Sequence, residues 1–132
     1  MNEISFAATG NLTADPELRF TTAGRAGVTI RFAVTPRRRT AGGDWVDQPA
    51  SYFTGTVWGP MAEHLAESVR KGDRVLVQGA LVTRTYTPSE GPRAGENLSR
   101  LEVEIDEIGP SLRWGTAQVT RSTGRTDQEP SA

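Results

Sequence analysis

Apolar and polar residues alternate along five stretches of this chain, which is the pattern of strands that bury one face. The alternation is clearest between Val28 and Val34, where every second residue is apolar and Thr29 and Arg31 stand among the others. The other predicted strands cover residues 4–10, with 18–20 as a continuation, and then 52–58, 75–86 and 101–105. Gly79 lies inside the fourth strand and indicates a bulge or a sharp bend there.

A segment with the apolar periodicity of a helix lies between the third and fourth predicted strands. Its apolar positions are Met61, Ala62, Leu65, Ala66 and Val69. Pro60 suits the first turn of this helix and Gly72 stops it. Three strands, one helix and two strands is the order of the OB fold, a partly open five-stranded barrel that binds oligonucleotides or oligosaccharides. We therefore expect an all-β protein with this fold, and an SH3-like barrel is the main competing architecture.

Two long polar segments interrupt the predicted strands. Residues 37–49 contain three consecutive arginines and a tryptophan, and residues 87–97 contain two prolines and two glycines. Loops of this length inside a compact domain are usually functional or disordered. From Gly115 onward apolar residues become rare, so we divide the chain into a barrel domain, residues 1–114, and a short flexible tail, residues 115–132.

Composition narrows the chemistry that this chain can perform. Its 132 residues are enough for one domain with a sizeable core, but they include no cysteine and only one histidine, His64. This excludes disulfides and thiol nucleophiles, and it leaves little for zinc or triad chemistry. We therefore expect no enzyme, no catalytic residue, no metal and no cofactor. No apolar run could span a bilayer and no signal peptide is recognisable, so we expect no membrane contact and a cytoplasmic location.

One row of carboxylates could, in principle, hold a metal ion. Glu102, Glu104 and Asp106 superficially resemble a set of metal ligands, but two-residue spacing on a strand is more typical of a solvated outer face. A nuclease is the enzyme class that an OB barrel with carboxylates and arginines could support. The sequence, however, places no cluster of acids beside Arg84 or Tyr86, so binding functions are favoured.

The most informative side chains are aromatic. In the strand 52–58, alternation places Tyr52 and Trp58 on one face among threonines, and Phe53 on the other face, as part of the core or of a subunit contact. Two aromatic rings among small hydroxyl residues make a poor core face and a good stacking platform. The simpler alternative is that both rings are ordinary half-buried sheet residues.

Basic residues accompany these aromatic rings, although the formal net charge is only −1. Fourteen of the fifteen basic residues are arginine, which can stack on bases and fork onto phosphates. A single-stranded nucleic acid requires both aromatic surfaces for its bases and cations for its phosphates. The predicted nucleic-acid-binding residues are Tyr52, Trp58, Tyr86, Arg84, Arg31, Arg37, Arg38, Arg39, Lys71 and Arg74.

Several of these assignments have alternatives. The arginines of the first loop could simply be solvated, and Arg74 could equally pair with an acid. Trp45 could stack on a base or fold back on the barrel. We expect Trp114, just past the last strand, to pack against the barrel or a neighbouring subunit.

Six short motifs follow one another between residues 4 and 108. They are Gly10-Asn11-Leu12, Asp15-Pro16-Glu17-Leu18-Arg19-Phe20, the segment 52–59, Arg70-Lys71-Gly72-Asp73-Arg74-Val75, Gly79-Ala80-Leu81 and Thr83-Arg84-Thr85-Tyr86. Each is weak alone, but in this order and spacing they resemble the bacterial single-stranded DNA-binding protein (SSB) family. The resemblance implies stacking positions at Tyr52, Trp58 and Tyr86, and basic positions on the DNA path at Arg84 and Lys71. It also implies a homotetramer around which single-stranded DNA wraps.

The chain departs from the family pattern in three ways. Arg38 stands where well-known members have a stacking tryptophan, and two other stacking sites carry tyrosine. The tail ends Asp127-Gln128-Glu129-Pro130-Ser131-Ala132, without the acidic run and apolar tip through which the family's tails recruit replication and repair enzymes. The resemblance therefore does not extend to that recruitment, and the chain looks like a short-tailed paralogue.

We expect the protein to bind and protect single-stranded DNA without strong sequence preference, associated with the nucleoid. The process would be replication, recombination, repair or DNA uptake, and RNA is an alternative ligand. The competing function is that of a protein-interaction OB subunit in a replication or segregation complex. In a monomer, the second face of the sheet, with Ile4, Phe6 and Phe53, could instead close on the chain's own helix.

Overall fold

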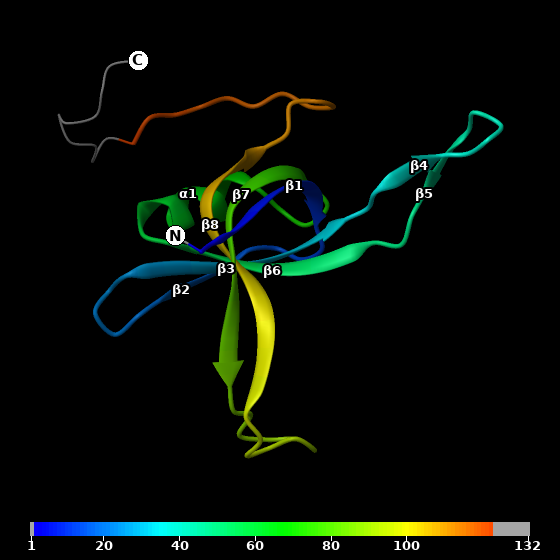
Figure 1. Ribbon diagram of the computed structural model, residues 1–132. Coiled ribbons are helices and arrows are strands. Elements are labelled where there is room, and N and C mark those ends of the chain that lie inside the picture. Colours follow the sequence, from blue (N-terminus) through cyan, green and yellow to red (C-terminus); the bar gives the residue numbers. More distant parts are fainter. Residues whose placement is uncertain (1, 123–132) are drawn as a thin grey trace.

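The computed structural model describes residues 2–122 of the chain. Nine elements follow one another in it (Figure 1): β1 (Ile4–Leu12), β2 (Glu17–Phe20), β3 (Ala26–Val34), β4 (Arg37–Arg39), β5 (Trp45–Asp47), β6 (Ser51–Trp58), α1 (Pro60–Ser68), β7 (Arg74–Tyr86) and β8 (Leu98–Pro110). The last ten residues, with the acidic end of the predicted tail, lie outside the described residues.

Five of these strands form a closed barrel. The sheet order is β1-β7-β8-β6-β3-β2, and an additional pairing of β1 with β3, through Asn11 and Leu12, closes the ring. The pair β6–β8 is parallel and the other pairs are antiparallel. With α1 between the third and fourth barrel strands, this is the predicted OB fold. Residues 18–20 do not continue the first strand; they belong to β2, which pairs with β3 instead.

The barrel interior is filled by the inward positions of the alternating strands. Phe32 is fully buried on β3, and its ring contacts Phe6 of β1 and Phe53 of β6, with ring centroids 6.0 and 5.6 Å away. Phe53 is therefore part of the monomer core, which was one of its two predicted roles. The buried aliphatic residues around this trio are Leu12, Val28, Ile30, Val57, Val75, Val77, Val103 and Ile105.

Helix α1 covers one end of the barrel. Gly59 precedes it with φ of 80°, a conformation that favours glycine, and Pro60 occupies the first turn as expected. Ala62 and Leu65 are buried on its inner face. At its other end the Arg70 guanidinium donates hydrogen bonds to the carbonyl oxygens of Ala66 and Val69, which would otherwise lack partners.

The predicted irregularity at Gly79 is present. Gln78 pairs with Glu107 whereas Gly79 pairs with Ile105, so Asp106 is an extra residue in β8 and forms a bulge. A Cβ atom at Gly79 would overlap the carbonyl oxygen of Glu104 on the neighbouring strand. Only glycine lets the two backbones approach this closely.

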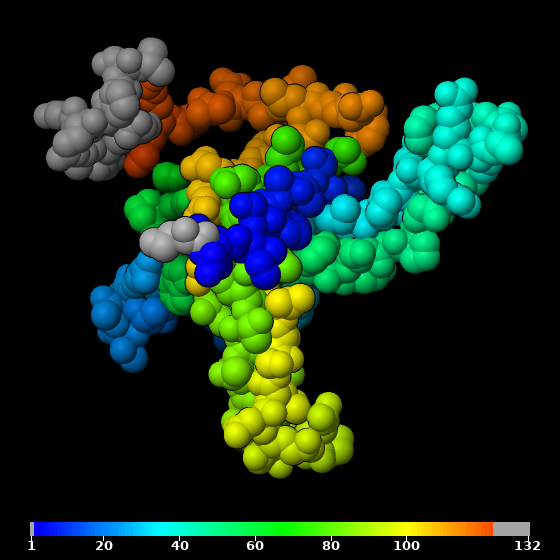
Figure 2. Space-filling view, viewed as in Figure 1, coloured from blue at the N-terminus to red at the C-terminus, as the bar shows by residue number. Residues whose placement is uncertain are grey.

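Hairpins extend from the barrel as separate arms (Figures 1 and 2). The first polar loop, predicted without regular structure, contains the hairpin β4–β5. Its turn is held by hydrogen bonds from the Asp44 N–H to the Thr40 hydroxyl and from the Thr40 N–H to the Asp44 carbonyl, with Gly43 at φ of 90°. The outer halves of β7 and β8 form a second arm. Strand β8 extends beyond its predicted range at both ends, from Leu98 in this arm to Pro110 in the barrel. No helix among residues 2–122 is long and apolar enough to cross a membrane.

Replacement of Gly79 by alanine tests the close approach at the bulge. We expect Gly79→Ala to lower the free energy of unfolding by about 1–3 kcal/mol, because the new methyl group collides with backbone and cannot be relieved by rotating a side chain. Urea denaturation followed by circular dichroism measures the change. Gly115→Ala is the control, since among the described residues a Cβ there meets nothing within 4 Å. Equal midpoints for the two variants would contradict the packing described here.

Candidate nucleic-acid interface

The outward face of β6 carries the aromatic residues that the alternation predicted. Tyr52 is 74% exposed and Trp58 is 46% exposed, whereas Gly55 and Val57 point into the barrel and are buried. Thr54 and Thr56 lie between the two rings on the same face and are half-buried. The strand therefore presents two rings separated by small polar side chains.

Strand β3 extends this face with small residues and one arginine. Ala33 lies opposite Tyr52, Arg31 opposite Thr54, and Thr29 opposite Thr56. Directly opposite residues of an antiparallel pair share a face of the sheet, so the exposed Arg31 side chain stands beside the threonines between the two rings. The predicted residues Tyr52, Trp58 and Arg31 are thus brought together on one surface.

Trp58 rests against the backbone of β3. It lies opposite Gly27, where a Cβ atom would come within 2.6 Å of the indole Cζ3. The Arg25 guanidinium carbon lies 4.9 Å from the centre of the indole. A hollow of about 250 Å³ adjoins the ring, lined by Arg19, Phe20, Thr21, Gly27, Val28, Thr29, Thr56 and Trp58.

Carboxylates lie next to this surface, on β8. Thr56 pairs with Glu104, which places Glu104 and Glu102 on the outward face beside β6. The Arg84 guanidinium lies 2.6 Å from Glu104 and 3.7 Å from Glu102, and Arg100 lies 2.6 Å from Glu102. Two arginines and two glutamates therefore form one ion-pair network.

This network corrects two expectations. Glu102 was predicted to be solvated, but it is only 5% exposed because Arg84 and Arg100, paired opposite each other on β7 and β8, both approach it. Acids were also predicted to be absent near Arg84, and two are adjacent. Across residues 2–122, no group of three or more histidine, aspartate or glutamate side chains is arranged to hold a metal ion.

Tyr86 lies at the outer end of β7, where the second arm begins. It is 40% exposed, and the Arg100 guanidinium carbon lies 5.0 Å from the centre of its ring. Neither Arg100 nor Glu102 is among the predicted nucleic-acid-binding residues. Their spacing of two residues on one strand was the available signal, since it places an arginine and a glutamate on the same face.

The three consecutive arginines lie on the hairpin β4–β5. Arg37 pairs with Asp47 at 3.4 Å and also lies 5.9 Å from the Trp45 ring. Arg38 and Arg39 are exposed, and among the described residues neither has a carboxylate within 4.0 Å. Trp45 is exposed on the hairpin and does not fold back into the core.

The remaining predicted basic residues lie at the beginning of β7. Lys71 is in the turn after α1, where its backbone N–H donates to the Asp15 carboxylate. Arg74 pairs with no acid in the described part of the chain; its guanidinium carbon lies 4.7 Å from the Trp114 ring. Trp114 was predicted to pack against the barrel or a neighbouring subunit; it is 75% exposed and touches the barrel through Arg74 of β7. Its contacts with Arg74 and Arg113 leave most of the ring in solvent.

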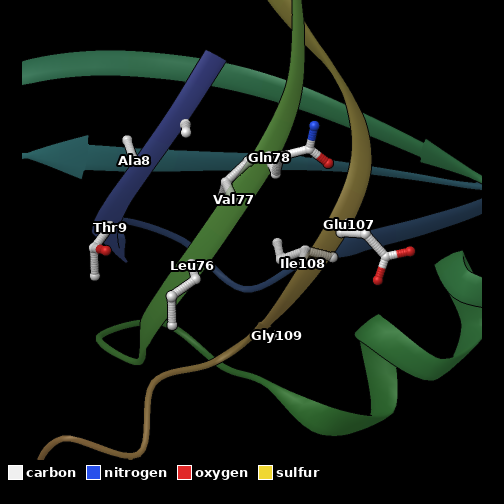
Figure 3. Close-up of a pocket in the computed structure, with 9 residues that line it drawn as sticks. Ala8, Thr9, Leu76, Val77, Gln78, Glu107, Ile108 and Gly109 are labelled. Carbon is white, nitrogen blue, oxygen red and sulfur yellow. The ribbon is translucent and has the colours of Figure 1, made fainter. Parts of the chain in front are cut away.

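A second hollow lies over β1, β7 and β8 (Figure 3). It has a volume of about 570 Å³ and is lined by Ala7, Ala8, Thr9, Leu76, Val77, Gln78, Glu107, Ile108 and Gly109. It contains neither an aromatic ring nor an arginine, so its chemistry differs from that of the β6 face.

Known proteins resemble this chain over most of its length. The model of the single-strand binding protein family matches residues 1–110. A single-stranded DNA-binding protein of Paenarthrobacter aurescens is 42% identical over 127 residues, which cover 96% of this chain and 72% of that protein. One of Mycobacterium leprae is 46% identical over 115 residues, which cover 86% of this chain and 66% of the relative.

A solved structure also resembles this chain. The crystal structure of a small single-stranded DNA-binding protein from Streptomyces coelicolor has a TM-score of 0.70 and 31% sequence identity. The match covers 85% of this chain and 97% of that one. The barrel, the aromatic face of β6 and these relatives lead to one conclusion: the chain belongs to the single-strand binding protein family.

Proposed function

We propose that this protein binds single-stranded DNA without strong sequence preference and protects it. The observation that carries the proposal is the outward face of β6, where the exposed rings of Tyr52 and Trp58 flank small threonines beside Arg31. Membership of a family whose named relatives are single-stranded DNA-binding proteins supports it.

The binding mechanism is stacking combined with neutralisation of phosphates. Bases stack on Tyr52 and Trp58, and on Tyr86 where the strand leaves the barrel. Every base has an aromatic face, so stacking tolerates any sequence. Because the threonines between the rings are small, a nucleotide backbone can approach the sheet there.

The basic residues contribute unequally to this mechanism. Arg31, Arg38 and Arg39 are exposed and without an ion pair among the described residues, so they are available to phosphates, as is Lys71 to a longer strand. Arg74 is half-buried against Trp114, so it is less accessible to a phosphate. Arg37 and Arg84 already share their charge with Asp47 and with Glu102 and Glu104. They neutralise a phosphate less effectively than an arginine without such partners.

The proposal includes self-assembly and a cellular role. The hollow over β1, β7 and β8, with the exposed Leu76 in its lining, suits contact between copies in a homotetramer around which the DNA wraps. The activity is binding alone, with no catalytic step and no cofactor. It would serve replication, recombination, repair or DNA uptake, in association with the nucleoid.

Tryptophan fluorescence during titration with oligo(dT) tests the proposal. We expect strong quenching by oligo(dT), little quenching by a duplex of equal length, and weaker binding as salt increases. Trp58→Ala should weaken binding by about 1–3 kcal/mol, the contribution of one stacked base. The absence of both quenching and a native-gel shift would refute DNA binding and favour a protein-interaction role for the barrel. Equal affinity for oligo(U) would extend the ligand to RNA.

The position of Trp58 can be changed without removing its ring. We expect Gly27→Ala to displace the indole, because the new Cβ would lie 2.6 Å from Cζ3, and so to weaken oligo(dT) binding in the same direction as Trp58→Ala. Fluorescence titration and near-ultraviolet circular dichroism measure the two effects. Gly115→Ala, where a Cβ meets nothing, is the control. Unchanged affinity in Gly27→Ala would mean that the position of the indole over β3 does not matter for binding.

Removal of the exposed arginines of the hairpin β4–β5 should change the salt dependence of DNA binding. Replacement of Arg38 and Arg39 together by alanine should reduce the slope of log K against log salt concentration by about 1.4, because each phosphate contact on a single strand contributes about 0.7. Affinities for oligo(dT) at four or more sodium chloride concentrations give the slope. Arg121→Ala, beyond the last strand, is the control. A slope that stays at the wild-type value would mean that these two arginines are solvated and contact no phosphate.

A further inference from the structure

Tyr86 differs from the other stacking candidates in what covers its ring. Tyr86 pairs with Leu98 and Arg84 pairs with Arg100, so Arg100 is the diagonal neighbour of Tyr86 on the same face. Its guanidinium carbon lies 5.0 Å from the centre of the phenol ring. That distance is within the range in which a cation is attracted to the face of an aromatic ring.

Arg100 is held in this place by a buried carboxylate. The Nε atom of Arg100 donates a hydrogen bond of 2.6 Å to Oε2 of Glu102, which is 5% exposed. A carboxylate with so little access to water is destabilised unless a cation pairs with it. Arg84 is the second cation near Glu102, but at 3.7 Å it lies farther away and has Glu104 at 2.6 Å as a closer partner. Glu102 therefore depends mainly on Arg100.

Trp58 also has an arginine over its ring, but no carboxylate of the described residues holds that arginine in place. Arg25 lies 4.9 Å from the Trp58 ring, but within residues 2–122 it forms no ion pair. A base can therefore displace Arg25 from Trp58 without leaving a buried charge unpaired. Displacement of Arg100 from Tyr86 would instead separate Glu102 from its main partner. The buried carboxylate would then be unpaired, which is unfavourable.

We propose that Arg100 is a positioning residue of the DNA interface. Fixed by Glu102, it occupies one face of Tyr86, so that a base stacks only on the opposite face. Arg100 acts through Tyr86 and does not neutralise a phosphate. This inference rests on the proposed function, since it concerns how one of the stacking rings is presented.

The competing role for Arg100 is that of a phosphate contact, and the two roles respond differently to substitution. Lysine keeps the charge but lacks the planar guanidinium that lies over a ring and pairs side-on with a carboxylate. A phosphate contact would be largely preserved in Arg100→Lys and would contribute about 0.7 to the salt slope. A positioning role requires the planar group and contributes nothing to the slope.

Affinity for oligo(dT) at several salt concentrations tests the proposal with the variants Arg100→Ala, Arg100→Lys, Glu102→Gln and Tyr86→Ala. We expect Arg100→Ala to weaken binding about two- to fivefold at every salt concentration, the equivalent of one exposed cation–π contact. Arg100→Lys should not restore the affinity. The double variant Arg100→Ala/Tyr86→Ala should bind no more weakly than Tyr86→Ala alone, because the two residues act as one unit.

A measurement without DNA tests the packing itself. In nuclear magnetic resonance spectra of the free protein, the side-chain protons of Arg100 should be shifted by the ring current of Tyr86. The shift should disappear in Tyr86→Leu and decrease in Glu102→Gln. Arg93→Ala is the matched control, because Arg93 lies on the same arm and pairs with Glu96 at 3.3 Å, but in the described part of the chain it lies over no aromatic ring. Its spectrum should keep the Arg100 shift.

The outcomes separate this proposal from the function on which it rests. If the wild-type protein does not bind oligo(dT), the proposed function fails and the positioning role fails with it. If binding is present but Arg100→Lys restores it, or if Arg100→Ala lowers the salt slope, the positioning role alone is overturned. Tighter binding by Glu102→Gln with a steeper slope would also overturn it, because Glu102 would then be masking a phosphate-binding arginine.

Discussion

The contact among Phe6, Phe32 and Phe53 is the interaction on which the candidate site depends. Phe32 and Phe53 pair opposite each other on β3 and β6, and their inward position fixes the register of both strands. A slip by one residue would send every side chain of a strand to the other face. The same packing that fills the core therefore holds Tyr52 and Trp58 outside, so the aromatic surface follows from burial of the phenylalanines.

The features that were predicted correctly from the sequence are determined by residues close together in the chain. Alternation separates Tyr52 from Phe53, and Pro60 marks the start of the helix, because both effects act within a few residues. The environment of Arg84 could not be obtained this way. It depends on which residue of β8 faces which residue of β7, and the extra residue Asp106 alters that register. Trp114 lies beyond the last strand, where no period predicts a contact.

A nearly neutral protein can present a surface for a polyanion when its charges are distributed unequally. Here the distribution is local: some arginines are matched by carboxylates within a few ångströms, as Arg84 is, and others, such as Arg38, have no such partner within residues 2–122. Net charge averages over both kinds. In the proposed interface, the aromatic face and the matched arginines would provide the shape, and the unmatched arginines would provide the attraction for phosphates.

The bulge at Asp106 allows one strand to serve two surfaces. Before it, the even-numbered residues Glu102 and Glu104 face the aromatic side, and after it the odd-numbered Glu107 and Gly109 line the hollow over β1 and β7 (Figure 3). Val103 and Ile105 before the bulge are buried in the core, and Ile108 after it packs against the core. Substitutions that adapt one surface therefore leave the other untouched, so the two can diverge separately during evolution. Deletion of Asp106 would leave a regular ladder between β7 and β8, without the extra residue that changes the outward positions from even to odd numbers.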